Sequence, residues 1–192
     1  MMDQIFSFEL KKLNDKRPRL QCLFRLITFI PFGLIDCLFS LSFEYIIPVL
    51  VFSILVFKEY PVFIFEYLEG YLKYHMKFIA FLFLITDEYP AFSKPSSVTF
   101  KLSPLTPLNP YKPLYKWFFI LPHLLLLMAL MIVLFAVLIF SWLSILITGR
   151  QPRICFTFVK NYYEWFLHVF CYGIYMVTDQ YPSIRFFSLF RG

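Results

Sequence analysis

Charged residues are scarce in this chain of 192 residues, which contains 18 Lys and Arg and 12 Asp and Glu. They make up 16% of the sequence, whereas 60% of it is hydrophobic and 22% aromatic. A soluble domain carries about 25% charged residues, so a soluble fold of this composition would expose large apolar patches. The shortage of charge therefore excludes an ordinary soluble domain and predicts a membrane protein.

Glycine is also scarce, with five in the whole chain. They are spread from Gly33 to Gly192 and form no glycine-rich loop of the kind that cradles a phosphate. The sequence also lacks a nucleophile elbow, in which a Ser sits between two glycines. We therefore expect neither an enzyme nor a cofactor.

Metal ligands are few, with four cysteines and three histidines. No two cysteines form a C-x-x-C pair, and all four lie within or beside apolar runs, which is typical of buried thiols. Glu164 and His168 are spaced i, i+4 and could seat a metal, but the chain offers no second pair of this kind. A polar stripe facing protein is the favoured interpretation, and no metal is expected.

The net charge of +6 comes from basic residues that cluster at the ends of apolar runs. This placement favours a membrane surface over nucleic acid as the partner. Near the N-terminus, a basic run from Lys11 to Arg19 follows a weak apolar patch that Asp3 and Glu9 interrupt. A cleavable signal has the opposite order, so we expect a retained basic arm.

The chain contains an internal repeat. A shift of 91 places Pro31 on Pro122 and Pro61 on Pro152, and a shift of 92 places Thr86-Asp87-x-Tyr89-Pro90 on Thr178-Asp179-x-Tyr181-Pro182. The stretch between the copies is rich in Pro and Ser and is typical of an extended linker. The expected division is a basic arm at 1–17, a first repeat at 18–92, a linker at 93–109 and a second repeat at 110–192.

Each copy begins with an apolar run, at 26–57 and at 117–148. A straight helix over such a run would be about 48 Å long, against a hydrocarbon core of about 30 Å. Pro31 and Pro122 offer a break. We therefore expect interfacial lead-in segments at 20–30 and 111–121, followed by membrane spans at 32–57 and 123–148.

A second, mixed helix is predicted in each copy, at 62–86 and 153–178. Each carries a polar stripe within an arc of about 100°. Such a helix either crosses the membrane with its stripe toward protein or lies flat at the interface. Crossing gives two parallel hairpins with most basic residues on the side of the N-terminus, whereas flat helices give inverted repeats and a more even division. The positive-inside rule favours four transmembrane helices, an all-α fold and both termini in the cytoplasm.

Two acidic residues, Asp36 and Glu44, lie inside the first apolar run, where the second copy has Leu127 and Phe135. Intramembrane carboxylates cost about 2.5–3.5 kcal/mol and mark a functional site by default. One hypothesis is a proton or cation site, and the other is ion pairing with a second helix, which is favoured because an unpaired buried charge is costly. The candidate residues are Asp36, Glu44, Lys73, Lys77, Lys160, Glu164 and His168, with His75 as a further partner.

The repeated Thr-Asp-x-Tyr-Pro motif has the features of a helix terminator. Its Pro forces the preceding Tyr out of helical geometry, and a Tyr suits the headgroup level. An Asp near a helix C-terminus opposes the macrodipole and needs a cation. We predict that Asp87 and Asp179 each find a cation or backbone donors in the basic segment that opens their own repeat, with Arg25 and Lys116 as the leading candidates. The structural motif then comprises Arg25, Asp87, Tyr89 and Pro90 in the first copy and Lys116, Asp179, Tyr181 and Pro182 in the second.

The second copy also contains Lys112-Pro113-Leu114-Tyr115-Lys116, Pro122-His123 and Gly149-Arg150-Gln151-Pro152-Arg153. With the repeated motif, these segments resemble an uncharacterised, mostly bacterial membrane family, domain of unknown function 4389, here in tandem. The first copy departs from the pattern with Phe32 in place of the His and Lys58-Glu59 in place of Gly-Arg. The resemblance implies a multi-pass protein of the bacterial cytoplasmic (inner) membrane and implies no activity.

Two functions are compatible with these observations. The first is an accessory or scaffold subunit that sits in the lipid bilayer and binds another membrane protein or a second copy of itself. The second is a small oligomeric ion- or proton-coupled transporter or channel that uses Asp36 and Glu44 at the repeat interface.

Overall fold

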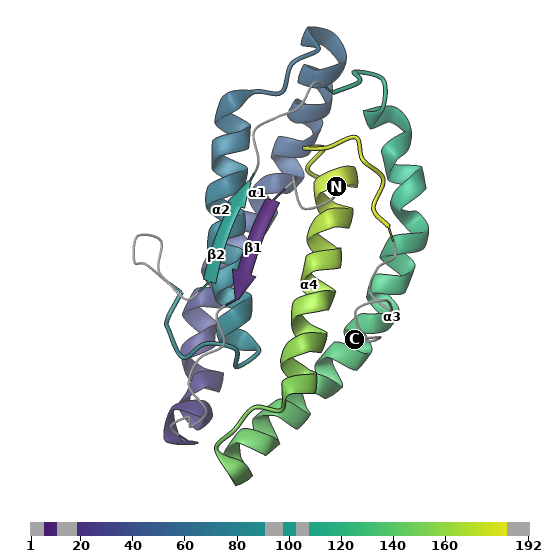
Figure 1. Cartoon of the computed structure of the whole chain (residues 1–192). Coiled ribbons are helices and arrows are strands. Elements are labelled where there is room, and N and C mark those ends of the chain that lie inside the picture. Colours follow the sequence, from purple (N-terminus) through teal and green to yellow (C-terminus); the bar gives the residue numbers. More distant parts are fainter. Residues whose placement is uncertain (1–5, 11–18, 91–97, 103–107, 184–192) are drawn as a thin grey trace.

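The computed structural model describes residues 6–10, 19–90, 98–102 and 108–183. The order of elements is β1 (Phe6–Leu10), α1 (Arg19–Phe57), α2 (Val62–Leu82), β2 (Val98–Leu102), α3 (Pro113–Thr148) and α4 (Arg153–Gly173) (Figure 1). Of the expected basic arm and linker, the structure describes only residues 6–10, 98–102 and 108–109. The fold is otherwise helical, as the sequence predicts.

Each repeat forms an antiparallel helical hairpin. In the first, the Tyr74 hydroxyl donates to the Phe32 carbonyl oxygen at 2.9 Å, and the Tyr67 and Ser42 hydroxyls lie 2.7 Å apart. Partners later in α1 thus meet residues earlier in α2. In the second, the Tyr162 hydroxyl donates to the Leu127 carbonyl oxygen at 3.3 Å, which joins α4 to α3.

The predicted breaks at Pro31 and Pro122 are wrong, because α1 and α3 are continuous helices of 39 and 36 residues that contain these prolines. Both proline rings lie on exposed positions. In apolar surroundings a helix is the conformation that satisfies the most backbone groups internally, so it continues through a proline. The separate lead-in segments at 20–30 and 111–121 are therefore parts of the long helices.

The second helices end earlier than predicted, at Leu82 and Gly173, and the Thr-Asp-x-Tyr-Pro motifs do not terminate them. A turn comes between helix and motif in both repeats. Its central residues, Leu84 and Met176, have φ of 61° and 55°, and their left-handed backbone reverses the chain. After the first turn, the Ile85 and Thr86 backbone N–H groups both donate to the Ala80 carbonyl oxygen, at 2.8 and 3.1 Å.

Two strands that were not predicted from the sequence pair in an antiparallel sheet, with Phe6 opposite Leu102, Phe8 opposite Phe100 and Leu10 opposite Val98. A shift of 92 maps β1 onto β2, so the strands are equivalent elements of the two repeats. The same shift exchanges the first and last of these pairs and leaves the central one in place. A pseudo-two-fold axis therefore passes through the Phe8–Phe100 pair.

The two hairpins are inverted relative to each other, which corrects the parallel arrangement predicted from the sequence. The Tyr60 hydroxyl, after α1, donates to the Tyr175 carbonyl oxygen, after α4, at 3.0 Å. At the other end, the Gln151 side-chain amide donates to the Phe83 carbonyl oxygen at 3.0 Å. Tyr60 and Gln151 are equivalent repeat positions, so the two bonds are symmetry mates. The antiparallel strand pair explains the inversion, because it orients the two repeats in opposite directions.

The elements form three layers. α1 and α3 pack against each other, and α2 and α4 pack on them. The strand pair lies over α2 and α4, where the Leu102 backbone N–H donates to Glu69 at 3.4 Å and the Phe6 ring lies 4.7 Å from the His168 ring (Figure 1). Glu69 is two positions from Tyr67, which contacts α1, so the sheet and α1 lie on opposite sides of α2.

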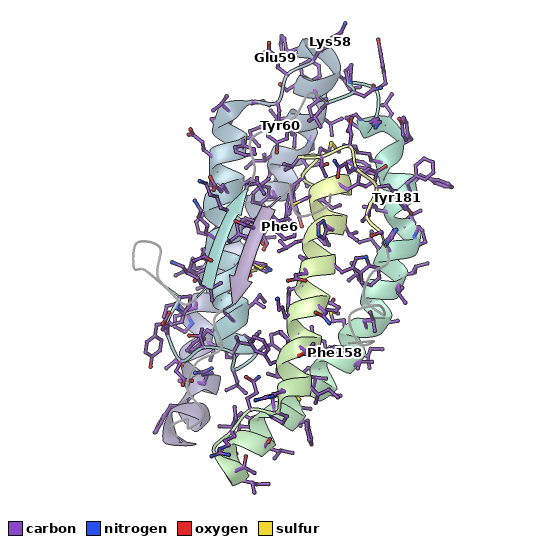
Figure 2. All side chains as sticks on the ribbon, viewed as in Figure 1. Phe6, Lys58, Glu59, Tyr60, Phe158 and Tyr181 are labelled. Atoms are coloured by element: carbon purple, nitrogen blue, oxygen red, sulfur yellow. The ribbon has the colours of Figure 1, made fainter. Side chains whose placement is uncertain are left out.

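Two surfaces with different chemistry result. The apolar face consists of exposed side chains from Phe24 to Phe57 of α1 and from Leu114 to Ile147 of α3, and Figure 2 shows side chains projecting outward from α3. Its members include Ile27, Ile30, Leu34, Leu38, Leu41, Val49, Phe52 and Val56 of α1 and Phe118, Leu121, Leu125, Met128, Ile132, Phe135 and Ile139 of α3. The polar face lies on the side of the sheet and consists of Ser7, Thr99 and Lys101 of the strands, Glu69 and Lys73 of α2, and Lys160 and Glu164 of α4.

Two helical segments, Ile27–Phe57 and Pro113–Thr148, have the length and hydropathy of membrane spans. The four spans predicted from the sequence are thus reduced to two candidates among the described residues.

Candidate functional site

A buried arginine joins the two helices of the first hairpin at its open end. The Arg25 guanidinium donates to the Asp87 carboxylate at 2.6 Å and to the carbonyl oxygens of Phe81 and Thr86 at 2.8 and 3.0 Å. It also lies over the Phe81 ring, 4.4 Å from the ring centre. We call this group of four residues the first clamp. The predicted pairing of Arg25 with Asp87 is confirmed.

The second clamp has the same design at the opposite end of the molecule. The Lys116 ammonium lies 2.7 Å from the Asp179 carboxylate and donates to the Thr178 carbonyl oxygen at 2.7 Å, which confirms the second predicted pair. The Asp179 carboxylate also accepts the Asn109 backbone N–H at 2.8 Å and lies 3.5 Å from the Lys112 ammonium. Lys116 lies over Tyr172, which is the repeat equivalent of Phe81.

Opposing effects act on the pKa of the Asp179 carboxyl. Burial raises it, but the hydrogen bonds from Lys116 and Asn109 and the charges of Lys116 and Lys112 outweigh burial and hold it below its ordinary value. A carboxyl with a lowered pKa stabilises the fold above its ordinary pKa, and this stabilisation is lost as the pH falls through the lowered value. The second clamp is therefore intact at neutral pH and released in acid.

The remaining motif residues support the clamps. Pro90 and Pro182 are buried. Tyr181 makes a hydrogen bond between its hydroxyl and His123 Nε2 at 2.9 Å, whereas its equivalent Tyr89 packs 5.9 Å from the Phe32 ring, where no such bond is possible. The Phe-for-His departure in the first copy thus exchanges a hydrogen bond for an aromatic contact.

The turn residues Leu84 and Met176 connect the hairpins. Leu84 is 2% exposed and packs against Ile145 of α3, and Met176 is fully buried in a cluster with Leu50 and Ile54 of α1. Each repeat thus inserts one side chain into the other. A signal for this role was present in the sequence, since both positions follow an apolar helix and precede the motif by two residues, but apolar composition alone does not distinguish them from their neighbours.

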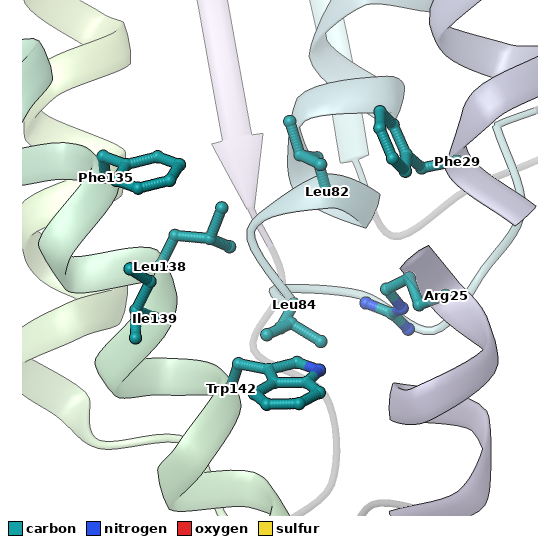
Figure 3. A pocket seen from close by; sticks show the side chains of 8 residues that line it. All are labelled: Arg25, Phe29, Leu82, Leu84, Phe135, Leu138, Ile139 and Trp142. Atoms are coloured by element: carbon teal, nitrogen blue, oxygen red, sulfur yellow. The ribbon is translucent and has the colours of Figure 1, made fainter. Parts of the chain in front are cut away.

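An apolar cavity of about 290 Å³ lies beside Leu84, between α1 and α3 (Figure 3). It is lined by Arg25, Phe29, Leu82, Leu84, Phe135, Leu138, Ile139 and Trp142. Phe135 and Ile139 belong to the apolar face, so the cavity is continuous with that surface.

Asp36 pairs with His75, since its carboxylate lies 2.8 Å from Nδ1 of that ring. The pair is largely buried between α1 and α2, next to a Ser40–Tyr71 hydroxyl contact of 3.0 Å. The imidazole stacks on Phe166 of α4, so the pair lies close to the contact between hairpins. This geometry supports the ion-pairing hypothesis for Asp36, with a histidine as the partner.

The other residues of the predicted intramembrane site are distributed over separate groups. Glu44 is exposed. Lys73 pairs with Glu69 at 2.9 Å, and Lys160 lies 3.5 Å from Glu164, each within its own helix. His168 packs against Phe6 of the sheet. The polar stripes of α2 and α4 therefore face the strand pair and its surroundings, and the strands are the partners that the sequence analysis missed.

Taken together, these features define a tandem-repeat helical protein with two helices apolar enough to span a membrane and a clamp at each end. The family described as Domain of unknown function (DUF4389) matches residues 19–94 and again residues 112–185, and the chain belongs to this family. The double match confirms the tandem repeat. Searches of the curated proteins and of the solved structures found no match.

Proposed function

We propose that this protein is a membrane-bound accessory or scaffold subunit that binds another membrane protein. The observation that carries the proposal is the division of its surface into two faces. Lipid covers the apolar face of α1 and α3, which has no other use in a folded monomer. The polar face remains available for a protein partner, with three lysines spaced over the sheet, α2 and α4.

The rigid construction favours a binding role over a catalytic one. Each clamp fixes the two helices of one hairpin, and both turn residues and the strand pair fix the hairpins relative to each other. The buried charged side chains of Arg25, Asp36 and Lys116 already have partners at hydrogen-bond distance. A fixed surface suits a scaffold, because a preorganised interface loses little conformational entropy on binding.

A second candidate function is proton- or ion-coupled transport. Inverted repeats with a polar site at their interface are typical of secondary transporters, and Asp36–His75 lies near the contact between hairpins. Proton flux into vesicles reconstituted with the purified protein tests this idea. A flux that the Asp36→Asn variant abolishes supports transport.

The location that goes with either function is the cytoplasmic membrane of a bacterium, as the family resemblance implies. Four crossings are not required for a scaffold. The inverted hairpins also remove the charge argument for them. Arg19, Arg25, Arg150 and Arg153 lie at one end of the bundle and Lys58, Lys112 and Lys116 at the other.

Photo-crosslinking in living cells tests the scaffold proposal. A photoreactive amino acid replaces Lys73 or Lys160 on the polar face, with Leu34 or Leu125 on the apolar face as matched controls. We expect one recurrent membrane-protein adduct from both polar positions and lipid adducts from the control positions. Protein adducts from the apolar positions alone would show that the partner surface is assigned to the wrong side.

A further inference from the structure

The charges of the polar face lie at the middle of the molecule's long axis. Lys73 is near the centre of α2, which runs from Val62 to Leu82, and its side chain is 47% exposed. Lys160 and Glu164 flank the centre of α4, with side chains 38% and 29% exposed. Exposed Lys101 lies on the strand pair between them. If the helices stood upright in a bilayer, all these charges would sit near its midplane, where each costs about 2.5–3.5 kcal/mol.

The apolar face is too long for an upright orientation. α1 has 39 residues and α3 has 36, so the helices extend about 58 and 54 Å, against a hydrocarbon core of about 30 Å. Exposed apolar side chains continue over this length, from Ile27 near one end of α1 to Val56 near the other. An upright helix would leave part of this surface in water at both ends. A helix parallel to the membrane keeps all of it in contact with lipid.

The symmetry of the fold points to the same orientation. The pseudo-two-fold axis passes through the centre of the strand pair, and the strands run along the bundle in the direction of its helices. In an upright molecule the axis would lie in the membrane plane, and β2 would carry Lys101 through the bilayer beside the four helices. With the axis along the membrane normal, the two hairpins and the two clamps lie at equal depth, and none of the described helices or strands crosses the membrane.

From these observations we infer that the protein lies in one leaflet, with α1 and α3 parallel to the membrane, the apolar face among the acyl chains and the polar face in water. An amphipathic surface that is apolar on one side and charged on the other binds at this depth. The basic residues at both ends of the bundle then lie at headgroup level, where they attract anionic lipids. The inference rests on the membrane-bound state proposed above and replaces spanning with in-plane insertion.

Two measurements on the full chain in sealed phosphatidylcholine–phosphatidylglycerol vesicles test this orientation. In the first, a membrane-impermeant amine reagent is added outside to protein bound from outside. We expect Lys73, Lys101 and Lys160 to react as fast as they do in detergent, and protection that detergent relieves would overturn the inference. Protection that persists in detergent would also overturn it, because a second copy would then cover the polar face.

The second measurement uses a lipid with a diazirine at the end of its acyl chain, followed by mapping of the labelled residues. In-plane insertion predicts labels from Ile27 to Val56 on α1 and none on the strands. Labels confined to the middle of all four helices would show an upright protein. The membrane-bound state itself is checked by flotation of the same vesicles, so a protein that floats and labels as upright contradicts only the orientation.

Discussion

The two hairpins hold the same backbone acceptors with different cations. In the first clamp, Arg25 divides its donors among the Phe81 and Thr86 carbonyl oxygens and the Asp87 carboxylate. In the second, the single ammonium of Lys116 serves Thr178 and Asp179, and a second lysine and a backbone N–H also act on Asp179. A guanidinium presents five donors in a rigid fork, whereas an ammonium presents three donors on a single nitrogen. The repeat therefore conserves the geometry of the clamp within one chain while its chemistry varies.

The hairpins differ more deeply at their centres. The first contains the buried Asp36–His75 pair, whereas the second has Leu127 and Phe166 at the equivalent positions. Because the second hairpin reaches the same fold with an apolar centre, the pair is not a requirement of the architecture. The pair is therefore particular to the first repeat, and proton transfer or ion binding, if the protein has either activity, is expected in that repeat.

The largest difference between the hairpins should appear when the clamp cations are removed. Arg25→Ala removes a donor from the Asp87 carboxylate and from two carbonyl oxygens in a largely buried site, and we expect the free energy of unfolding to fall by about 4 kcal/mol. Lys116→Ala leaves Asp179 with Lys112 and Asn109, so the expected loss is about 2–3 kcal/mol. Equilibrium unfolding in mild detergent measures both, with exposed Arg153→Ala as a control that stays within about 0.5 kcal/mol.

The comparison between the clamps depends on the order of these effects. Equal losses for the two variants would mean that Lys112 and Asn109 do not stabilise the Asp179 carboxylate once Lys116 is removed. A loss under 1 kcal/mol for Arg25→Ala would contradict the role of the first clamp in holding α1 and α2 together.

The next effect tests whether the first hairpin can adopt the apolar centre of the second. His75→Phe leaves the Asp36 carboxylate buried without its partner, at an expected cost of about 3 kcal/mol. Asp36→Leu leaves the imidazole without the carboxylate and costs about 1–2 kcal/mol. The double variant has the residue types of the second hairpin, and we expect it to recover to within about 1 kcal/mol of the parent, because apolar residues of similar volume often replace a buried ion pair without loss.

The double-mutant cycle is read from thermal or denaturant unfolding of all four proteins in one detergent. Additive losses in the double variant would show that the two side chains act independently and that the 2.8 Å contact contributes no coupling.

The sequence predicted the parts of this molecule that depend on local pattern. The repeat, the hairpins and the Arg25–Asp87 and Lys116–Asp179 pairs follow from spacing and from the need of an Asp at a helix end for a cation. The direction of the repeats did not follow, because the count of basic residues assumed that each end of a hairpin lies on one side of a membrane. That assumption is a property of the surroundings and is not encoded in either repeat.

The strands were missed although their signal was present. Phe6-Ser7-Phe8-Glu9-Leu10 and Val98-Thr99-Phe100-Lys101-Leu102 both alternate apolar and polar residues and are related by the shift of 92. Each is five residues long, and the second lies in a stretch rich in Pro and Ser, so composition concealed the pattern. For Asp36, the sequence predicted a small set of candidate partners that included His75. It did not predict which of them makes the contact, because that depends on how α1 and α2 pack.

The two inner helices, α2 and α4, each contain a glycine, and the two glycines differ in how closely other atoms pack around them. A Cβ at Gly173 would lie 2.4 Å from Ile120 Cγ2, whereas a Cβ at Gly70 would meet no atom within 4 Å. Gly173→Ala therefore requires the Ile120 side chain or the contact between α3 and α4 to shift and should cost about 1–3 kcal/mol. Gly70→Ala improves helix propensity without a clash and should stabilise by up to about 1 kcal/mol. Opposite shifts in melting temperature are expected, and stabilisation by Gly173→Ala would show that the α3–α4 contact is looser than its distances indicate.

The smallest expected difference in stability between the two repeats concerns the turn residues that follow α1 and α3. Lys58 and Gly149 are equivalent positions after α1 and α3, and both have left-handed backbone, with φ of 58° and 71°. Glycine adopts this conformation without strain, whereas a side chain there costs about 1 kcal/mol or more. Lys58→Gly should therefore stabilise the protein by about 0.5 kcal/mol, the gain being reduced by the greater freedom of glycine in the unfolded chain. Gly149→Lys should destabilise it by about 1–2 kcal/mol. Both effects are measured by the same detergent unfolding.

Because Ser53 and Ser144 donate equivalent hydrogen bonds to the carbonyl oxygens of Glu59 and Arg150, at 3.3 and 3.2 Å, the two turns have matched surroundings. A change of the same sign in both variants would mean that the exposed Lys58 side chain makes a stabilising contact of its own, and the two turns would then differ in more than backbone strain.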